Sequence, residues 1–321
     1  MGRRQISSEL IRHSRSFFLI LGLVSCPIVY MYLSAGEKGE ELVRSFECCK
    51  GIEHLELWGD AVKWGSDFKL DSAQECCKAC KDTCNATKGE CLCDSWVFCG
   101  HRDACGIQFG ECWLKKQKDT LDPELRDSGD KVMWTSGIIY GKGEGIVGLE
   151  TSGYGVIYIK LLPECAPHSV SYILELLATR NCPGCHFYRA ESRGSAWDLE
   201  GHHIKDAPFG PPSALIQGTL KAHEFIFDKI SKEVSSPIYR GSVAWVGSGP
   251  EFFISLANHN EWKNEYSVFG FVLPEYMKIV EKIAQLPTKP DLWSNINVSI
   301  LRKTVDLRFR RLNSEDLITQ Y

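Results

Sequence analysis

The sequence predicts a mainly β protein: a closed β-barrel capped by two helices, preceded by a small, disulfide-rich α+β domain. Two observations predict the barrel. Short runs of aromatic and β-branched residues lie between Gly and Pro residues, which is typical of strands in an all-β core. Two longer segments have the apolar periodicity of helices. The third observation is a cluster of cysteines before these runs, which predicts the disulfide-rich domain.

The composition limits the partners. A chain of 321 residues accommodates two domains, each with its own core. The net charge is -4, with basic and acidic residues intermixed, so we expect no nucleic acid partner. Cysteine is the unusual component, with fifteen residues, eleven of them between Cys48 and Cys112. This density predicts disulfides and hence an oxidising compartment.

An apolar run without charge occupies residues 17–33, with arginines before it and glutamates after it. As a helix it spans roughly 25 Å. We expect a type II single-pass signal anchor, with the rest of the chain on the lumenal side of the endoplasmic reticulum or Golgi. A cleaved signal peptide is the alternative, although Leu33 is unfavourable two residues before a cut after Ala35. Asn85 and Asn297 begin glycosylation sequons, which are usable only on the lumenal side.

Glycines at 141, 143, 145 and 148 predict a flexible linker between two domains. The expected division is a cytosolic tail (1–16), the transmembrane signal anchor (17–33), a cysteine-rich domain (46–140), the linker (141–150), the barrel domain (151–306) and a C-terminal tail (307–321).

In the cysteine-rich domain, Ser72 and Glu75 predict the capped start of a helix. Cys76, Cys80 and Cys84 would then lie on one helix face, bridged to strands. The predicted strands are Trp96-Val97-Phe98, Cys112-Trp113-Leu114 and a closing Val132-Met133-Trp134.

This pattern resembles a PAN or apple domain. The residues that carry the resemblance are Ser72 to Cys84, Trp96-Val97-Phe98 and Cys112-Trp113-Leu114-Lys115. The resemblance implies a helix disulfide-bonded onto a small antiparallel sheet, and a module that binds a glycan or protein ligand. A zinc site is the alternative, from Cys77 and Cys80 with Cys91 and Cys93 or with His101. It is disfavoured because lumenal thiols are usually oxidised.

Eleven cysteines cannot all pair within one domain. Three more follow, which gives fourteen disulfide candidates beyond the predicted membrane segment: Cys48, Cys49, Cys76, Cys77, Cys80, Cys84, Cys91, Cys93, Cys99, Cys105, Cys112, Cys165, Cys182 and Cys185. If all are paired, at least one disulfide links the two domains. Cys182-Pro183-Gly184-Cys185 could suggest a redox enzyme, but it lacks the βαβ context, so a local loop disulfide is preferred.

In the barrel domain, residues 154–162 alternate as a strand, and Pro167 opens a helix with apolar residues at positions 170, 173, 174 and 177. A second helix begins at Pro274, with Tyr276, Met277, Val280 and Ile283 on its apolar side. Short strands lie between these helices, and residues 298–305 form the last strand. Two helices around many short strands indicate a closed barrel.

Residues 152–305 resemble the cyclophilin family of peptidyl-prolyl isomerases. The resemblance is carried by Ala166-Pro167, Ser169-Val170, Phe187-Tyr188-Arg189, Gln217-Gly218, Gly241, Val243-Ala244, Phe252-Phe253-Ile254, Trp262 and Tyr266-Ser267-Val268-Phe269-Gly270. The resemblance implies that the protein catalyses rotation about X-Pro bonds of proline-containing client proteins or peptides, and that it needs no cofactor. The barrier to this rotation, about 18 to 20 kcal/mol, comes from amide resonance. An apolar pocket with a fixed cation would stabilise the twisted bond.

By this resemblance Arg189 is the catalytic cation. Phe253 is the floor of the proline pocket, Leu215 its wall, and Gln217 orients the arginine. The full set of implied substrate-binding residues is Phe253, Gln217, Leu215, Ala214, Glu251, Val246, Trp262 and Tyr266.

The sequence also departs from the family. Ala214 replaces a large phenylalanine, Gly247 replaces Asn, and Glu251 replaces Gln. Either Glu191 or Glu251 could pair with Arg189. An insert at 190–213 could cover the groove. Its His202 and His203, with His223, could be read as metal ligands, but adjacent histidines in such a loop are usually solvated, so we expect no metal. Two hypotheses remain: an active isomerase, and a degenerate module that binds proline segments or glycans.

Overall fold

The structure is a computed structural model that describes residues 48–84, 91–179, 182–223, 227–233 and 236–312. The expected membrane anchor and the sequon at Asn85 lie outside these ranges. Within them, every helix is too short or too polar to cross a membrane.

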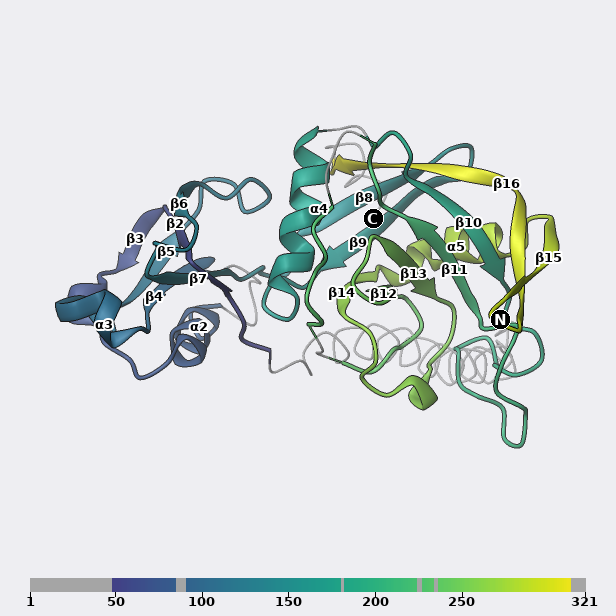
Figure 1. Ribbon diagram of the computed structural model, residues 1–321, viewed down its shortest axis with the longest axis horizontal. Coiled ribbons are helices and arrows are strands. Elements are labelled where there is room, and N and C mark those ends of the chain that lie inside the picture. Colours follow the sequence, from purple (N-terminus) through teal and green to yellow (C-terminus); the bar gives the residue numbers. More distant parts are fainter. Residues whose placement is uncertain (1–47, 85–90, 180–181, 224–226, 234–235, 313–321) are drawn as a thin grey trace, which may run out of the picture. The chain divides into compact units, whose positions relative to one another are not determined.

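The cysteine-rich part contains a five-stranded antiparallel sheet (Figure 1). Its strands, in spatial order, are β1 (Ile52–Glu53), β7 (Trp134–Ile138), β4 (Ser95–Cys99), β5 (Cys112–Lys116) and β3 (Asp60–Lys63). A separate pair is formed by β2 (Leu55–Leu57) and β6 (Leu125–Ser128). The helical elements are α2 (Ala73–Lys81), α3 (Arg102–Cys105) and 3-10 turns at Gly65–Asp67 and Gly106–Gln108.

Helix α2 starts where the capping pattern predicts. The Ser72 hydroxyl accepts a hydrogen bond from Glu75 N, and the Glu75 carboxylate accepts from Asp71 N. The helix ends at Lys81, so the prediction that it includes Cys84 is wrong. The Thr83 hydroxyl donates to Cys80 O, and this local hydrogen bond competes with another helical turn.

The closing strand of this sheet also differs from its prediction. Strand β7 begins at Trp134, two residues later than expected, and continues through Gly137. Val132 N instead donates to Gly129 O, which closes a turn over Asp130 and Lys131. Residues before Trp134 therefore belong to the turn.

All fourteen cysteines between 48 and 185 are paired in disulfides. The pairs are Cys48–Cys165, Cys49–Cys77, Cys76–Cys112, Cys80–Cys93, Cys84–Cys91, Cys99–Cys105 and Cys182–Cys185. The predicted link between the two domains is confirmed by Cys48–Cys165. Because the thiols of the zinc alternative are all consumed, that alternative is wrong. Two disulfides fasten α2 to the sheet region, one to β5 and one to the residue two before β4.

The second part is a closed eight-stranded barrel, as predicted. Its antiparallel order is β10 (His186–Glu191), β11 (Leu215–Thr219), β13 (Glu251–Ser255), β12 (Ser242–Trp245), β14 (Val268–Val272), β9 (Gly155–Leu161), β8 (Ile146–Thr151) and β16 (Ile296–Arg311). Pairing of β10 with β16 closes the barrel (Figure 1). The short β15 (Thr288–Trp293) forms a hairpin with the start of β16.

Two helices accompany the barrel, as predicted: α4 (Pro167–Thr179) and α5 (Met277–Ala284). A 3-10 turn at Pro274–Tyr276 precedes α5, and another lies at Asn260–Trp262. Met277, Val280 and Ile283 are buried, as the apolar periodicity predicted. The barrel core is aromatic, with Phe187, Trp245 and other large side chains fully buried.

The barrel extends beyond the predicted strands at both ends. Gly148, which we expected in the linker, lies in β8. Strand β16 continues past 305 to Arg311, where the sequence suggested a tail. Val305, Leu307 and Phe309 are buried and alternate with charged residues, because this half of β16 pairs with β10 and then with β8 and has one face toward the core.

Candidate functional site

The site is built on a β-bulge in β10. Phe187 pairs with Gly218 and Arg189 with Gln217, so Tyr188 is the extra residue of the bulge. The bulge brings Tyr188 and Arg189 into contact with the same side chain, Gln217, although neighbours in a regular strand point to opposite faces. A Cβ at Gly218 would lie 2.5 Å from His186 O, so the close approach of β11 requires glycine there.

Arg189 donates hydrogen bonds to three side chains, the longest from Nη2 to Ser213 Oγ at 3.5 Å. Its Nε donates to Glu191 Oε1 at 3.0 Å, and its Nη1 donates to Gln217 Oε1 at 2.9 Å. The guanidinium also lies over the ring of Trp293, 5.5 Å from the ring centroid. The Arg189 side chain remains 12% exposed, whereas that of Glu191 is 1% exposed. The cation is therefore fixed in direction, and a small part of it is still exposed to solvent.

Glu191 is the buried counterion of Arg189. Burial alone would raise its pKa, but the hydrogen bond from Arg189, the bond from Ser213 N at 2.6 Å and the arginine charge together hold the pKa below its usual value. Its Oε1 also accepts from Ser299 N at 3.1 Å. The carboxylate thus connects β10, the end of the insert and β16.

Of the two carboxylates that could pair with Arg189, Glu191 does so and Glu251 does not. The Glu251 carboxylate accepts a hydrogen bond from the Tyr188 hydroxyl. Tyr188 in turn accepts from Gln217 Nε2 at 2.7 Å. Burial, followed by the hydrogen bond to Glu251, raises the pKa of Tyr188, so the hydroxyl stays protonated and donates. A continuous hydrogen-bonded chain therefore runs from Arg189 through Gln217 and Tyr188 to Glu251.

An apolar aromatic cluster lies next to this chain. The Phe253 ring meets those of Trp262 and Tyr266 edge-on, at centroid distances of 5.7 Å and 5.0 Å. Phe253 is opposite Gln217 in the register of β11 and β13, so the rings lie beside the arginine. Leu215 is buried, and Val246 is 37% exposed. Phe253 itself is only 2% exposed, so the partly exposed rings of Trp262 and Tyr266 supply the apolar surface within reach of the fixed cation.

The insert contacts the site through Trp197. The Trp197 ring lies 5.1 Å from that of His259, which stacks on Trp262 at 3.6 Å. Ala214, at the end of the insert, is fully buried with a φ of 47°. The insert therefore supports Trp262 indirectly, because Trp197 packs on His259 and His259 stacks on Trp262.

The three histidines considered as metal ligands do not converge. His202 is exposed and lies beside Asp198, His203 stacks on Phe209, and His223 lies against the Cys182–Cys185 loop at Gly184.

His259 makes stability depend on pH. Burial lowers its pKa below the ordinary 6.5, while the nearby Glu261 opposes this shift. Below pH 6.5 the unfolded chain binds a proton that the folded chain does not yet bind, so the free energy of unfolding falls as the pH falls. In thermal unfolding series, His259→Gln should lose this part of the pH dependence. An unchanged slope would contradict the assignment.

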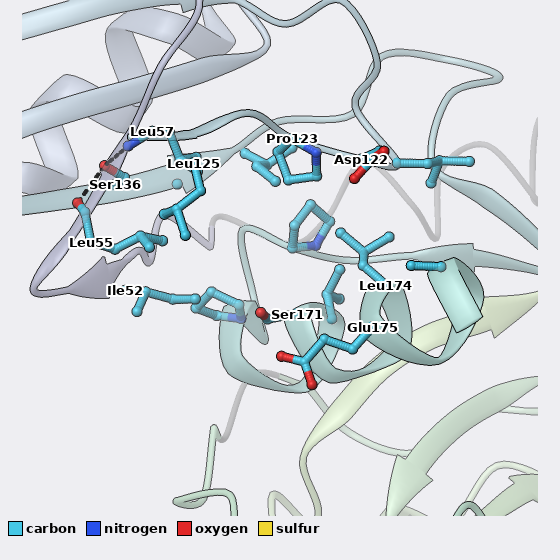
Figure 2. Close-up of a pocket in the computed structure, with 17 residues that line it drawn as sticks. Ile52, Leu55, Leu57, Asp122, Pro123, Leu125, Ser136, Ser171, Leu174 and Glu175 are labelled. Atoms are coloured by element: carbon cyan, nitrogen blue, oxygen red, sulfur yellow. Dashed lines mark hydrogen bonds between the residues drawn. The ribbon is translucent and has the colours of Figure 1, made fainter. Parts of the chain in front are cut away.

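A separate apolar cavity of about 290 Å³ lies between the cysteine-rich part and α4 (Figure 2). Its walls include Ile52, Leu55 and Leu125 on one side and Leu174 on the other. None of the residues expected to bind peptide lines it. It is therefore distinct from the groove at Arg189.

Comparison with known proteins agrees with the barrel geometry. Residues 146–305 match the family model "Cyclophilin type peptidyl-prolyl cis-trans isomerase/CLD". These residues form a cyclophilin-type domain. No curated protein matches the chain.

Two solved structures of a Cryptosporidium parvum cyclophilin type peptidyl-prolyl cis-trans isomerase are similar to the chain. The first is 15% identical to this chain, with a TM-score of 0.36. The match covers 53% of this chain and 99% of the chain in that structure. The other, in the presence of the dipeptide Ala-Pro, has 16% identity and a TM-score of 0.34 and covers 52% and 99%.

The cyclophilin-type domain also contains site residues that the sequence did not reveal. Trp293 contacts both Arg189 and Tyr188, yet it lies in β15, about a hundred residues away in the chain. Only the pairing of β10 with β16 brings this hairpin to the arginine. No local sequence pattern marks such a residue.

Proposed function

We propose that the cyclophilin-type domain isomerises X-Pro bonds, with Arg189 as the catalytic cation. The observation that carries the proposal is the placement of an accessible guanidinium, fixed by Glu191 and Gln217, beside the Phe253 aromatic cluster. A proline ring on this cluster would bring its amide nitrogen to the guanidinium.

Catalysis requires stronger interactions with the twisted amide than with the planar one. When the bond twists, resonance is lost and the prolyl nitrogen becomes a hydrogen-bond acceptor. Arg189 carries five N–H groups, and its bonds to Glu191, Gln217 and Ser213 use three of them. A remaining N–H can donate to the prolyl nitrogen without any loss of the supporting contacts, and this supplies the preference for the twisted state.

We further propose that the protein acts on secretory proteins, as a type II membrane protein of the endoplasmic reticulum or Golgi. Seven disulfides among the described residues support an oxidising compartment. The disulfide-bonded helix on a small antiparallel sheet supports a PAN-like module that binds proteins or glycans.

A binding module without catalysis is the second candidate. Two departures favour it, the small Ala214 and the carboxylate of Glu251 in the groove. In this candidate, proline segments would occupy the aromatic cluster without bond rotation.

Refolding of a small secreted protein with a proline-limited slow phase separates the two candidates. The enzyme should accelerate that phase at substoichiometric amounts. If the protein binds the unfolded chain but leaves the rate of the slow phase unchanged, the isomerase proposal is wrong and the binding module stands.

A further inference from the structure

Glu251 lies next to the aromatic cluster, and its side chain is partly exposed. Glu251 and Phe253 are two residues apart in β13, so their side chains lie on the same face of the sheet, about 7 Å apart along the strand. An extended peptide advances about 3.3 Å per residue. When a proline lies on the aromatic cluster and the peptide runs along β13, a side chain one or two residues from the proline reaches Glu251.

The charge of Glu251 is not offset within the site. Arg189, the nearest guanidinium in the hydrogen-bonded chain, has its own counterion in Glu191 at 3.0 Å. Glu251 accepts instead from Tyr188, which is a neutral donor. Among the described residues, no Lys, Arg or His forms an ion pair with Glu251. The group of Arg189, Glu191 and Glu251 thus carries one net negative charge, located at Glu251.

The other carboxylates near the aromatic rings have basic partners. Glu261 contacts His259 at 2.7 Å, and Glu265 contacts Lys232 at 3.4 Å. Glu251, whose side-chain donor is the neutral Tyr188 hydroxyl, can therefore receive a cation from a bound peptide.

We propose that Glu251 makes the groove selective for proline segments with a lysine or arginine one or two residues from the proline. This inference rests on the proposed peptide site at Phe253 and Arg189 and adds the class of substrate. The same carboxylate should disfavour segments with aspartate or glutamate at that position, because like charges repel across the short distance.

Short peptides with one Ala-Pro bond test the proposal on the full chain. In each peptide one neutral residue is replaced with Lys or with Glu, either the residue directly before the Ala-Pro pair or one of the two residues after it. The Kd and the catalysed isomerisation rate are measured near pH 8, where histidines are neutral. At one position, Lys should improve kcat/KM about fivefold over the neutral peptide, and Glu should reduce it by a similar factor. Salt of about 0.5 M should weaken both effects.

Variants of the protein test whether Glu251 causes the difference between Lys and Glu peptides. Glu251→Gln can still accept from Tyr188 and should abolish the difference between Lys and Glu peptides, while Glu251→Lys should reverse it. Glu265→Gln removes the same charge from a carboxylate that is paired with Lys232, and it should leave the difference intact. The proposal is overturned if the difference between Lys and Glu peptides persists in Glu251→Gln. It is also overturned if Glu265→Gln removes that difference to the same extent.

Failure of the inference differs from failure of the proposed function. If the neutral peptide is isomerised and the Lys and Glu peptides behave alike, the inference is wrong and the isomerase stands. If no peptide binds or is isomerised, both are wrong.

Discussion

Replacement of Arg189 with alanine is expected to lower the catalysed rate of X-Pro isomerisation at least about a hundredfold. A preorganised donor to the transition state typically contributes about 3 to 4 kcal/mol. Arg189 is the donor that both Glu191 and Gln217 orient. The rate constant kcat/KM for a neutral Ala-Pro peptide is the appropriate measurement.

Arg189→Lys is the matched control for charge. Lysine keeps the cation, but its single ammonium cannot reproduce the planar geometry that contacts Glu191 and Gln217 together. Its activity should therefore be well below that of wild type. Far-ultraviolet spectra and thermal unfolding establish whether each variant is folded. A folded Arg189→Ala variant with activity within a few-fold of wild type would contradict the assigned role.

Replacement of Glu191 with alanine is expected to lower the free energy of unfolding by about 4 kcal/mol. The change leaves the Arg189 cation, only 12% exposed, without its counterion. It also removes the acceptor for Ser213 N and Ser299 N. Denaturant unfolding of the variant and wild type measures the difference.

Glu251→Ala provides the contrast. Glu251 is partly exposed and accepts from a neutral hydroxyl, so its loss should cost about 1 kcal/mol. If the two alanine variants destabilise the protein equally, Glu191 is not the principal counterion of Arg189. A double-mutant cycle of Arg189 with Glu191 should then show no coupling.

The sequence was sufficient to predict the barrel, because the barrel strands carry strong local signals. The runs around Phe187, Ile216 and Phe253 are aromatic or β-branched and bounded by Gly or Pro, and each became a strand of the cyclophilin-type domain. Strand β8 was missed because Gly148 resembles a linker residue, and it is a strand only through its pairing with β9 and β16. Local propensity cannot report such pairing.

The site was only partly predictable for the same reason. The proximity of Arg189 and Gln217 followed from the family resemblance. The resemblance could not decide whether Glu191 or Glu251 is the partner of the arginine, because that choice depends on the bulge at Tyr188. The bulge brings the tyrosine hydroxyl to Gln217 and to Glu251, while Arg189 remains with Glu191. A one-residue irregularity of this kind leaves no reliable signal in sequence.

The most direct test of the proposed function is the exchange between cis and trans signals of a neutral Ala-Pro peptide, measured by NMR at equilibrium with a small amount of the protein. The account predicts that wild type accelerates the exchange far above the uncatalysed rate, which takes tens to hundreds of seconds, and that Arg189→Ala does not. Shifted peptide signals without faster exchange would show binding alone and would contradict the isomerase.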